Sequence, residues 1–422
     1  MATQICLFED ESYARLLPLV YFRPVFNLRC GILSLKEKVQ HAYPDTAVTL
    51  HCRSYLADYM RLRNPTLTVN HITADIVLFI NGRSIVDAQF AKDVPVNGRD
   101  MLYLDGATIV AARVSGKKLA DLKQRMNGLF APQDFDGLPV QQVTANVVNF
   151  PWDLIKHNGA QLRNDYATLT RGAAMESSAY TLYPGVHLLN EKEIFISPGT
   201  VIKPGVVIDA EDGPVFIGRN VVIQPFSTIM GPAWIGDNSV IKSGAKIYHN
   251  TSIGPVCKVG GEIEETIIHS YSNKQHDGFI GHSYLGAWVN CGAGTVTSDL
   301  KNNYGPVKVY VNGEPVDSGM QFVGVTIGDH SKTAINSTFN TGTVIGVSSN
   351  VFGTGFPPKY VPSFSWGAAG ETFTTYNLDK AVDVAAKVMI RRGITLTEAE
   401  KELFTTLFGL TGAERRKRGM PL

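Results

Sequence analysis

A large apolar residue recurs every six positions through the second half of the chain. A period of six fits neither an α-helix, which repeats after about 3.6 residues, nor an alternating strand. A strict short repeat is typical of a solenoid, in which each sextet forms one short strand and a turn. The repeated positions are Ile217, Ile223, Ile229, Ile235, Ile241, Ile247, Ile253 and Val259, and later Ile327, Thr333, Phe339, Ile345 and Val351.

Glycine follows four of these apolar residues, at Gly218, Gly236, Gly254 and Gly260. Glycine suits turns that need a positive φ or no side chain. We therefore expect one apolar side chain per sextet to point inward, and three sextets to close one triangular coil. The alternative is a stack of β-sandwich strands, which the constant phase of the repeat disfavours.

The repeat changes phase in three places. Residues 209–214 are acidic and contain glycine, so we predict a loop that bulges from a coil. We also predict that residues 261–275 break out of the stack, and that residues 299–304 and 307–323 form an insertion. Functional residues are often found on such loops, because the stack does not dictate their sequence.

The first 150 residues show a different pattern, in which strand-like and helix-like segments alternate. Such alternation predicts an α/β domain with a mostly parallel sheet. In these sheets ligands bind beyond the carboxyl ends of the strands. We expect strands at residues 5–8, 47–50, 75–80 and 107–114, and helices at 34–41, 55–63 and 117–126.

The patterns together divide the chain into four parts. Residues 1–150 form the α/β domain, 151–180 a helical linker, 181–370 the repeat domain and 371–422 a helical extension. The charge is balanced, with 39 Lys and Arg against 38 Asp and Glu, which argues against nucleic acid or a membrane surface as partner. No signal peptide or membrane span is apparent, and five scattered cysteines are typical of reduced thiols in a cytoplasmic protein.

The segment after the first strand contains a candidate phosphate-binding motif. Arg15, Pro18, Leu19, Arg23 and Pro24 match in phase the signature of sugar-nucleotide nucleotidyltransferases, Gly-x-Gly-x-x-Arg, Leu-x-Pro-Leu and Arg-Pro-Lys, which this segment resembles. The resemblance implies a nucleotidyltransferase-like, Rossmann-like fold. The chain departs from the family where Asp10, Glu11, Ser12 and Tyr13 replace the glycines and Val25 replaces the lysine.

Two further positions concern nucleotide and metal binding. Arg83 stands where related enzymes carry an aspartate that binds Mg²⁺, so it could hold a phosphate directly, as could Arg29. Arg83 could equally be a surface loop residue. The segment around Trp152 resembles two-domain sugar-phosphate nucleotidyltransferases, which makes Asp153 the candidate metal ligand; it could also be a helix-capping residue.

The repeat domain resembles the hexapeptide-repeat family of left-handed parallel β-helices, and the left hand is taken from that resemblance. Residues 276–295 resemble the active-site coil of the acetyltransferase half of N-acetylglucosamine-1-phosphate uridyltransferases. That family has a catalytic histidine, a substrate-binding asparagine fourteen residues later and Gly-Ala-Gly-Thr. Its motif matches this chain without a gap at His276, Asn290, Gly292, Ala293, Gly294 and Thr295.

Three other residues belong to this candidate site. Phe279 replaces the family tyrosine, and Tyr284 could supply the missing hydroxyl. His282 is the rival of His276 as general base, because residues 281–286 match the motif under a small shift. Lys274 is the lysine nearest in sequence for a sugar phosphate, although a solvated lysine is the simpler interpretation. Backbone N–H groups of the Gly292–Gly294 turn could hold an oxyanion.

The whole-chain resemblance is to an alternative bacterial form of the bifunctional uridyltransferase and acetyltransferase. It implies acetyl transfer from acetyl-CoA to the amine of a sugar phosphate, and nucleotidyl transfer from UTP or dTTP to a sugar 1-phosphate, with Mg²⁺ and a homotrimer. The alternative is an acyltransferase alone, whose N-terminal domain only binds a sugar nucleotide. A non-catalytic scaffold would need neither His276 nor Asn290.

Overall fold

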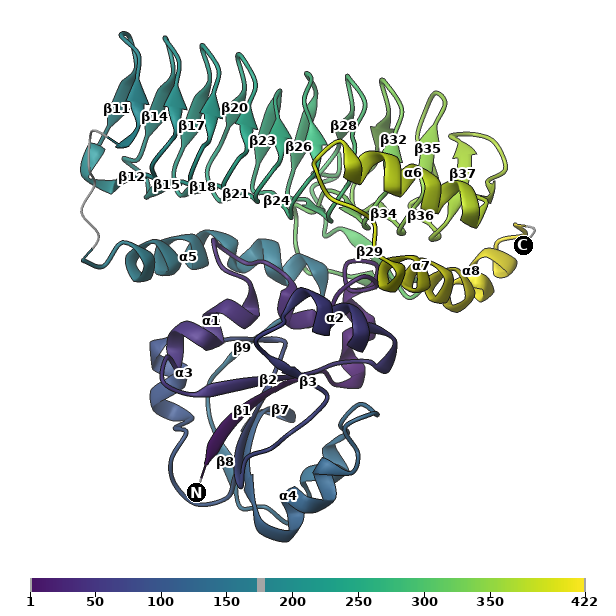
Figure 1. Cartoon of the computed structure of the whole chain (residues 1–422). Coiled ribbons are helices and arrows are strands. Elements are labelled where there is room, and N and C mark those ends of the chain that lie inside the picture. Colours follow the sequence, from purple (N-terminus) through teal and green to yellow (C-terminus); the bar gives the residue numbers. More distant parts are fainter. Residues whose placement is uncertain (1, 173–178, 421–422) are drawn as a thin grey trace.

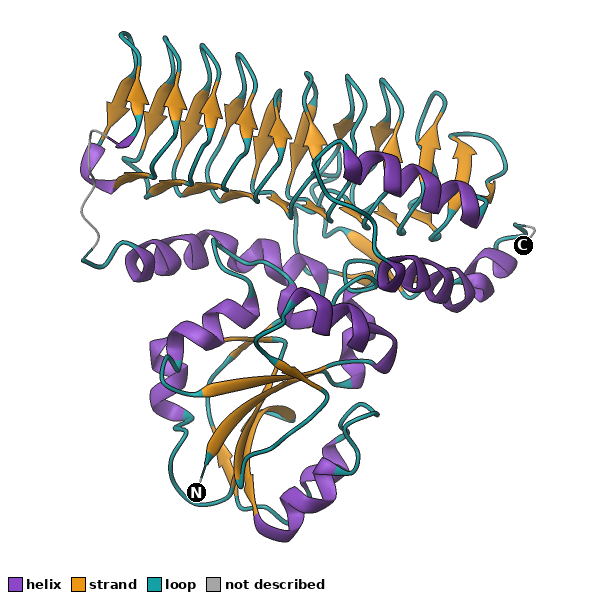
Figure 2. Ribbon diagram, in the orientation of Figure 1, coloured by secondary structure: helices purple, strands orange, loops and turns teal. Residues whose placement is uncertain are grey.

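The computed structural model describes residues 2–172 and 179–420, and it places an α/β domain beneath a long triangular prism of short strands (Figures 1 and 2). The N-terminal sheet has the order β3-β2-β1-β4-β7-β6-β8, and only β7 runs antiparallel to its neighbours. Its strands are β1 (Thr3–Phe8), β2 (Ala47–His51), β3 (Thr68–Val69), β4 (Ile76–Asn81), β6 (Met101–Asp105), β7 (Thr108–Ser115) and β8 (Val140–Gln142).

Both faces of this sheet are buried because consecutive residues of its central strands are apolar. On β1, Ile5 and Leu7 face one core, while Cys6 and Phe8 face the other. The predicted α/β fold is confirmed, whereas β3, β6 and β8 were not predicted. The domain also contains α1 (Leu35–Ala42), α2 (Ala57–Arg63), α3 (Ala88–Asp93), α4 (Gly116–Lys123), and the small pair β5 (Ser84–Ile85) and β9 (Asn146–Val147).

The prism has three parallel sheets, one for each side. The first comprises β10 (Thr181–Leu182), β13 (Val201–Ile202), β16 (Val222–Ile223), β19 (Val240–Ile241), β22 (Lys258–Val259) and β25 (Asn273–Lys274), and continues through Asn290 to β32 (Lys332–Thr333), β35 (Asn350–Phe352), β37 (Ser365–Ala368) and the antiparallel β38 (Thr374–Thr375). The second comprises β11 (His187–Leu189), β14 (Val207–Asp209), β17 (Thr228–Met230), β20 (Lys246–Ile247), β23 (Glu262–Glu264) and β26 (Phe279–Gly281), beside the pair β28 (Val296–Thr297) and β33 (Thr338–Phe339). The third comprises β12 (Ile194–Ile196), β15 (Val215–Ile217), β18 (Ala233–Ile235), β21 (Thr251–Ile253), β24 (Ile267–Ile268), β27 (Tyr284–Leu285), β31 (Thr326–Ile327), β34 (Val344–Ile345) and β36 (Tyr360–Val361).

The repeated apolar residues line the axis of this prism, so the predicted β-helix is confirmed. Ile223, Ile241 and Val259 are fully buried and lie in register on adjacent strands of the first sheet. Residues 210–214 form the expected loop between β14 and β15. The predicted insertion is an antiparallel hairpin of β29 (Lys308–Val311) and β30 (Glu314–Asp317).

The prediction that residues 261–275 leave the stack is wrong. They contribute β23, β24 and β25, which pair in register with the previous coil. The phase changes because two corners are shorter, so that the inward positions fall at Ile263, Ile268 and Lys274 instead of every sixth residue. The six-residue period can therefore be lost from the sequence although the coils of the β-helix continue.

Helices join the two domains. Helix α5 (Pro151–Leu169) runs along the third sheet, between the prism and the N-terminal domain (Figure 1). The prism side chains Ile267 and Tyr284 belong to the same hydrophobic core as Phe26 of the N-terminal domain and Leu407. Leu407 lies in the second of three C-terminal helices, α6 (Leu378–Ile390), α7 (Glu398–Leu410) and α8 (Gly412–Lys417). Within residues 2–172 and 179–420, no helix has both the length and the apolar character needed to cross a membrane.

Candidate functional site

A shallow groove runs along the prism corner that follows the first sheet. This corner is opposite the third sheet and therefore farthest from the N-terminal domain, at the top of Figure 1. The groove has a volume of about 480 Å³ and is lined by Lys242, His276, Asp277, Ala293 and Gly294, among others. The structure thus brings the exposed His276 next to part of the Gly-Ala-Gly-Thr turn, although seventeen residues separate His276 from Ala293.

The Gly-Ala-Gly-Thr turn is shaped by close packing of coils. A Cβ atom on Gly292 would lie 2.4 Å from the carbonyl carbon and oxygen of Ala334, and Gly294 has a φ of +69°. The N–H groups of Gly292 and Gly294 donate to the carbonyls of Thr333 and Asp277. Two of the three N–H groups expected to hold an oxyanion are therefore already bonded. The Ala293 N–H makes no hydrogen bond to the residues that the structure describes.

Asn290 and Lys274 belong to the first sheet and do not line this groove. The Asn290 side-chain oxygen accepts a hydrogen bond from Asn273 Nδ2 at 3.3 Å. Lys274 is only 1% exposed, and its ammonium donates to the carbonyls of Gly260 and His276. Burial lowers the pKa of Lys274. In this structure Lys274 fixes the loop that carries His276, and its ammonium does not face the groove.

His282 lies at a different corner, between the second and third sheets. Its Nδ1 is 2.8 Å from Asp299 Oδ2, and its ring stacks on Phe322 with centroids 5.0 Å apart. Its Nε2 is 4.0 Å from a Glu265 carboxylate oxygen. The structure therefore separates the two candidate histidines. His282 is the one with a carboxylate partner, and His276 is the one in the groove.

Tyr284 lies away from both histidines, on the third sheet. Its hydroxyl accepts the backbone N–H of Arg29 at 3.1 Å, and burial is the main cause that raises its pKa to about 12. Tyr284 is completely buried against the N-terminal domain. In this structure its hydroxyl joins the two domains and does not replace the one missing at Phe279.

The four candidate nucleotide-binding arginines separate into two pairs. Arg15 and Arg83 line a cavity of about 210 Å³ at the carboxyl ends of β1 and β4, where α/β sheets bind ligands. Arg83 is buried and forms a bidentate pair with Asp10, with Nε–Oδ1 at 3.0 Å and Nη2–Oδ2 at 2.6 Å. Its Nη1 donates to Asn149 Oδ1 at 2.7 Å. The two departures from the family motif, Asp10 and Arg83, thus neutralise each other.

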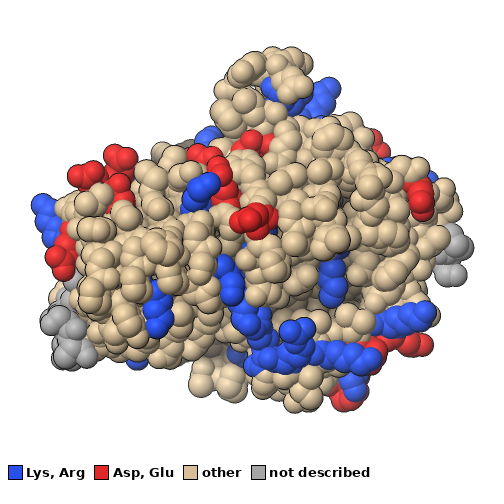
Figure 3. Space-filling model, turned by 90° about the horizontal axis from the view of Figure 1, so that it is seen from above, with Lys and Arg blue, Asp and Glu red and all other residues tan. Residues whose placement is uncertain are grey.

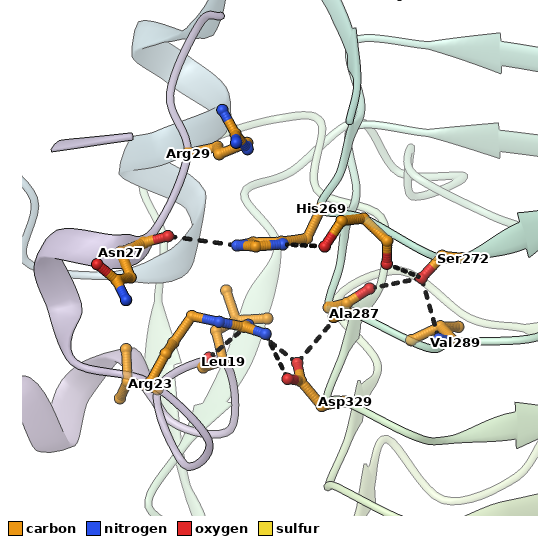
Figure 4. Close-up of polar contacts among 12 residues, drawn as sticks. Leu19, Arg23, Asn27, Arg29, His269, Ser272, Ala287, Val289 and Asp329 are labelled. Carbon is orange, nitrogen blue, oxygen red and sulfur yellow. Dashed lines mark hydrogen bonds and ion pairs between the residues drawn. The ribbon is translucent and has the colours of Figure 1, made fainter. Parts of the chain in front are cut away.

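Arg23 and Arg29 lie instead at the interface between the domains (Figure 4). Arg23 Nη1 is 2.9 Å from Asp329 Oδ1 in the prism, and its Nη2 also pairs with Asp329. Arg29 donates from Nη1 to the Ile32 carbonyl at 2.7 Å, and its guanidinium lies over the Trp234 ring. The match to the family motif predicted that all four arginines belong to one nucleotide site. In the structure Arg23 and Arg29 lie between the two domains instead.

The residues at the carboxyl edge of the sheet do not fit Mg²⁺. Asp153 accepts the N–H groups of Asn149 and Phe150 at 2.8 and 2.9 Å and so caps α5. Asp10 is bonded to Arg83, whose positive charge would repel a divalent cation. Within the described residues no group of three His, Cys, Asp or Glu side chains could hold a metal ion.

Sequence reasoning missed Asp299 and Asp329, the carboxylate partners of His282 and Arg23. Asp299 lies seventeen residues after His282, about one coil further, so the coil length is the signal that could have found it. Asp329 lies 306 residues from Arg23. No local pattern connects those two positions, because only the docking of the domains brings them together.

Comparisons with known proteins agree with this two-part architecture. Residues 5–174 match the family model described as "Sugar nucleotidyl transferase", and residues 214–249 match "Bacterial transferase hexapeptide (six repeats)". The N-terminal domain is a sugar nucleotidyltransferase domain. Hexapeptide repeats form the prism that follows it.

Several curated relatives match parts of the chain. A "Bifunctional protein GlmU" of Methanococcus maripaludis is 37% identical over 207 residues, covering 48% of this chain and 42% of that protein. A "Bifunctional sugar-1-phosphate nucleotidylyltransferase/acetyltransferase" of Sulfurisphaera tokodaii is 32% identical over 174 residues, covering 36% of this chain and 43% of that protein. A "Bifunctional protein GlmU" of Bartonella quintana is 24% identical over 337 residues, covering 74% and 65%. The chain thus spans less than two thirds of the length of these relatives.

Among solved structures, the chain is similar to a "UDP-N-acetylglucosamine acyltransferase" from Campylobacter jejuni. The identity is 13%, the match covers 55% of this chain and 94% of that one, and the TM-score is 0.23.

Proposed function

We propose that the chain is a two-domain enzyme of sugar-nucleotide synthesis, similar to UDP-N-acetylglucosamine diphosphorylase and glucosamine-1-phosphate N-acetyltransferase. The prism would transfer an acetyl group from acetyl-CoA to the amine of a sugar phosphate. The N-terminal domain would transfer a nucleotidyl group from UTP or dTTP to a sugar 1-phosphate. The observation that carries the proposal is the union in one chain of a sugar nucleotidyltransferase domain and hexapeptide repeats, as in the relatives named bifunctional.

The groove at His276 is the proposed site of acetyl transfer. A sugar amine is protonated at neutral pH and must lose a proton before it attacks the thioester carbon. An exposed histidine can accept that proton, because a neutral imidazole is a base that works near physiological pH. The attack forms the N–C bond, the C–S bond breaks, and the proton leaves with the CoA thiol. The Ala293 N–H is the donor proposed to face the oxyanion, and Lys242, which lines the same groove, would hold a phosphate.

The alternative base is His282. Its bond to Asp299 would orient the ring and stabilise the imidazolium, as a carboxylate does for a catalytic histidine. His276 remains the proposed base because it shares a groove with Ala293 and Gly294, whereas His282 lies at another corner. His282 would then position the loop that contains Asp299.

A second candidate function is supported by the Arg83–Asp10 pair. If the paired residues prevent metal-dependent chemistry, the N-terminal domain binds a sugar nucleotide without turning it over, and the chain is an acyltransferase alone. Arg15 lines the same cavity and forms no ion pair among the described residues, so it is the guanidinium available to a pyrophosphate.

We also propose a cytoplasmic homotrimer. All five cysteines are buried and free, which fits a reducing compartment. Two large apolar side chains, Phe226 and Ile335, are 74% and 69% exposed at the same corner as His276, on coils to either side. Uncharged residues predominate when the molecule is seen from above (Figure 3). A three-fold axis along the prism would allow neighbouring subunits to cover these side chains.

A pair of assays tests the proposal. Purified protein is incubated with acetyl-CoA and glucosamine 1-phosphate, and separately with UTP and N-acetylglucosamine 1-phosphate with or without Mg²⁺. Mass spectrometry detects the acetylated sugar phosphate and the nucleotide sugar. Both products would support the two-domain enzyme, and the acetylated product alone would support the second candidate. Neither product would contradict both.

A further inference from the structure

A third cavity lies where the N-terminal domain, the prism and the C-terminal helices meet. It has a volume of about 240 Å³ and shares no lining residue with the His276 groove or the Arg15 cavity. Arg29 and Lys36 come from the N-terminal domain, Trp288 and His330 from the prism, and Phe404 from α7. Figure 4 shows part of its wall, with Arg23 facing Asp329 and Asn27 facing His269 across the interface.

The charged side chains of the inner wall of this cavity are paired with each other. Arg23 is paired with Asp329, and Asp329 also accepts the Ala287 N–H at 3.1 Å. Both ring nitrogens of His269 have partners, Ser270 Oγ at 2.9 Å and the Asn27 carbonyl at 3.3 Å. Burial holds the pKa of His269 well below its usual value, so the ring is neutral. The inner wall therefore contributes shape and no net charge.

Three polar atoms of lining residues have no partner in the described structure. His330 is 7% exposed and its Nδ1 is unbonded, and so are Arg29 Nε and Asn27 Oδ1. These three atoms have almost no accessible surface, so they lie behind the cavity wall, and the indication of a ligand comes from the rim.

The charge of the rim indicates an anion. Lys36 and Arg63 line the opening, and neither has a carboxylate within ion-pair distance among the described residues. Among the acidic lining residues, Glu37 pairs with Arg29 at 3.5 Å and Glu400 caps helix α7. Aromatic side chains line the rest, among them Phe22, Tyr59 and Trp288.

We propose that this interdomain cavity binds a small phosphate ester that carries a ring. Its phosphate would pair with Lys36 and Arg63, and its ring would lie against the aromatic wall. A nucleoside monophosphate and a sugar phosphate both have this chemistry. Because the walls come from both domains, the ligand would connect them and resist their separation.

The experiment is isothermal titration calorimetry on the full chain with UMP, glucosamine 1-phosphate and inorganic phosphate as probes. Lys36→Ala combined with Arg63→Ala should weaken binding of the ring phosphate at least tenfold, and the ligand should raise the Tm of the unsubstituted chain more than that of the double variant. Arg61→Ala is the matched control, because Arg61 lies on the same helix but pairs with Asp58. His276→Ala is the control for the groove, and this variant should still bind the probe at the interdomain cavity.

Comparison of UMP with glucosamine 1-phosphate shows whether the ligand is a nucleotide or a sugar phosphate. Binding of inorganic phosphate without binding of either ring-bearing probe would overturn the requirement for a ring. Two further results would overturn the site itself: no binding of any probe, or equal affinity of the double variant and the unsubstituted chain. Both substituted residues lie at the rim, so an unchanged Tm without ligand shows that the double variant is folded.

Discussion

The ion pair between Arg23 and Asp329 gives the most specific prediction about how the two domains hold together. Their side chains are 8% and 3% exposed, so each charge depends on the other for solvation. Asp329→Asn removes the negative charge and keeps an oxygen that can accept the Ala287 N–H. Leaving one charge of a buried pair without its partner costs about 3–5 kcal/mol. We expect the free energy of unfolding to fall by that amount.

The assay is urea denaturation followed by tryptophan fluorescence and far-UV circular dichroism. The midpoint urea concentrations of the variants are compared where their m-values agree. Coincidence of the fluorescence and circular dichroism curves justifies a two-state treatment. Arg23→Met with Asp329→Asn should be more stable than Asp329→Asn alone, with a coupling energy of about 2 kcal/mol or more. Asp58→Asn, which breaks the exposed pair with Arg61, should change stability by less than about 0.5 kcal/mol. A loss for Asp329→Asn as small as this control would refute the reasoning.

Three further predictions follow from other parts of the structure. Phe226→Ser with Ile335→Ser should shift the trimer toward monomer in light scattering, and an unsubstituted chain that is already monomeric at micromolar concentration would contradict the assembly. Arg15→Ala should weaken nucleotide binding about tenfold in calorimetry, whereas unchanged affinity would remove Arg15 from the site. Burial holds the pKa of His51 at about 4 when folded, against about 6.5 unfolded, so the unfolded state binds more protons between these values and stability falls as pH falls from 6.5 to 4. His51→Gln should reduce that slope by about 1.4 kcal/mol per pH unit, and an unchanged slope would refute the assignment.

The fold was largely predictable because its period is local. A coil of three sextets places the same residue type on the axis again and again, so the series from Ile217 to Val259 could be recognised without knowing any distant contact. The error at residues 261–275 has the same cause. Shorter corners shift the phase there and place a lysine, Lys274, at an inward position where the pattern predicts an apolar residue.

The sites were predictable only in part. The spacing of His276 and the Gly-Ala-Gly-Thr turn was visible in the sequence, and the groove contains parts of both. The sequence could not indicate that Arg83 is bonded to Asp10, or that Arg23 points toward the prism. Tertiary packing brings these partners together, and a local sequence motif contains no information about it.

The most direct test of the account is the rate of acetyl transfer to glucosamine 1-phosphate by His276→Ala and His282→Ala across pH 6–9. Loss of a general base costs about 10²–10⁴-fold. We expect that loss in kcat for His276→Ala, with KM for acetyl-CoA little changed and a smaller loss at high pH, where more of the amine is already neutral. His282→Ala should retain most of its rate. A normal rate for His276→Ala with a collapsed rate for His282→Ala would contradict the account and give the role to His282.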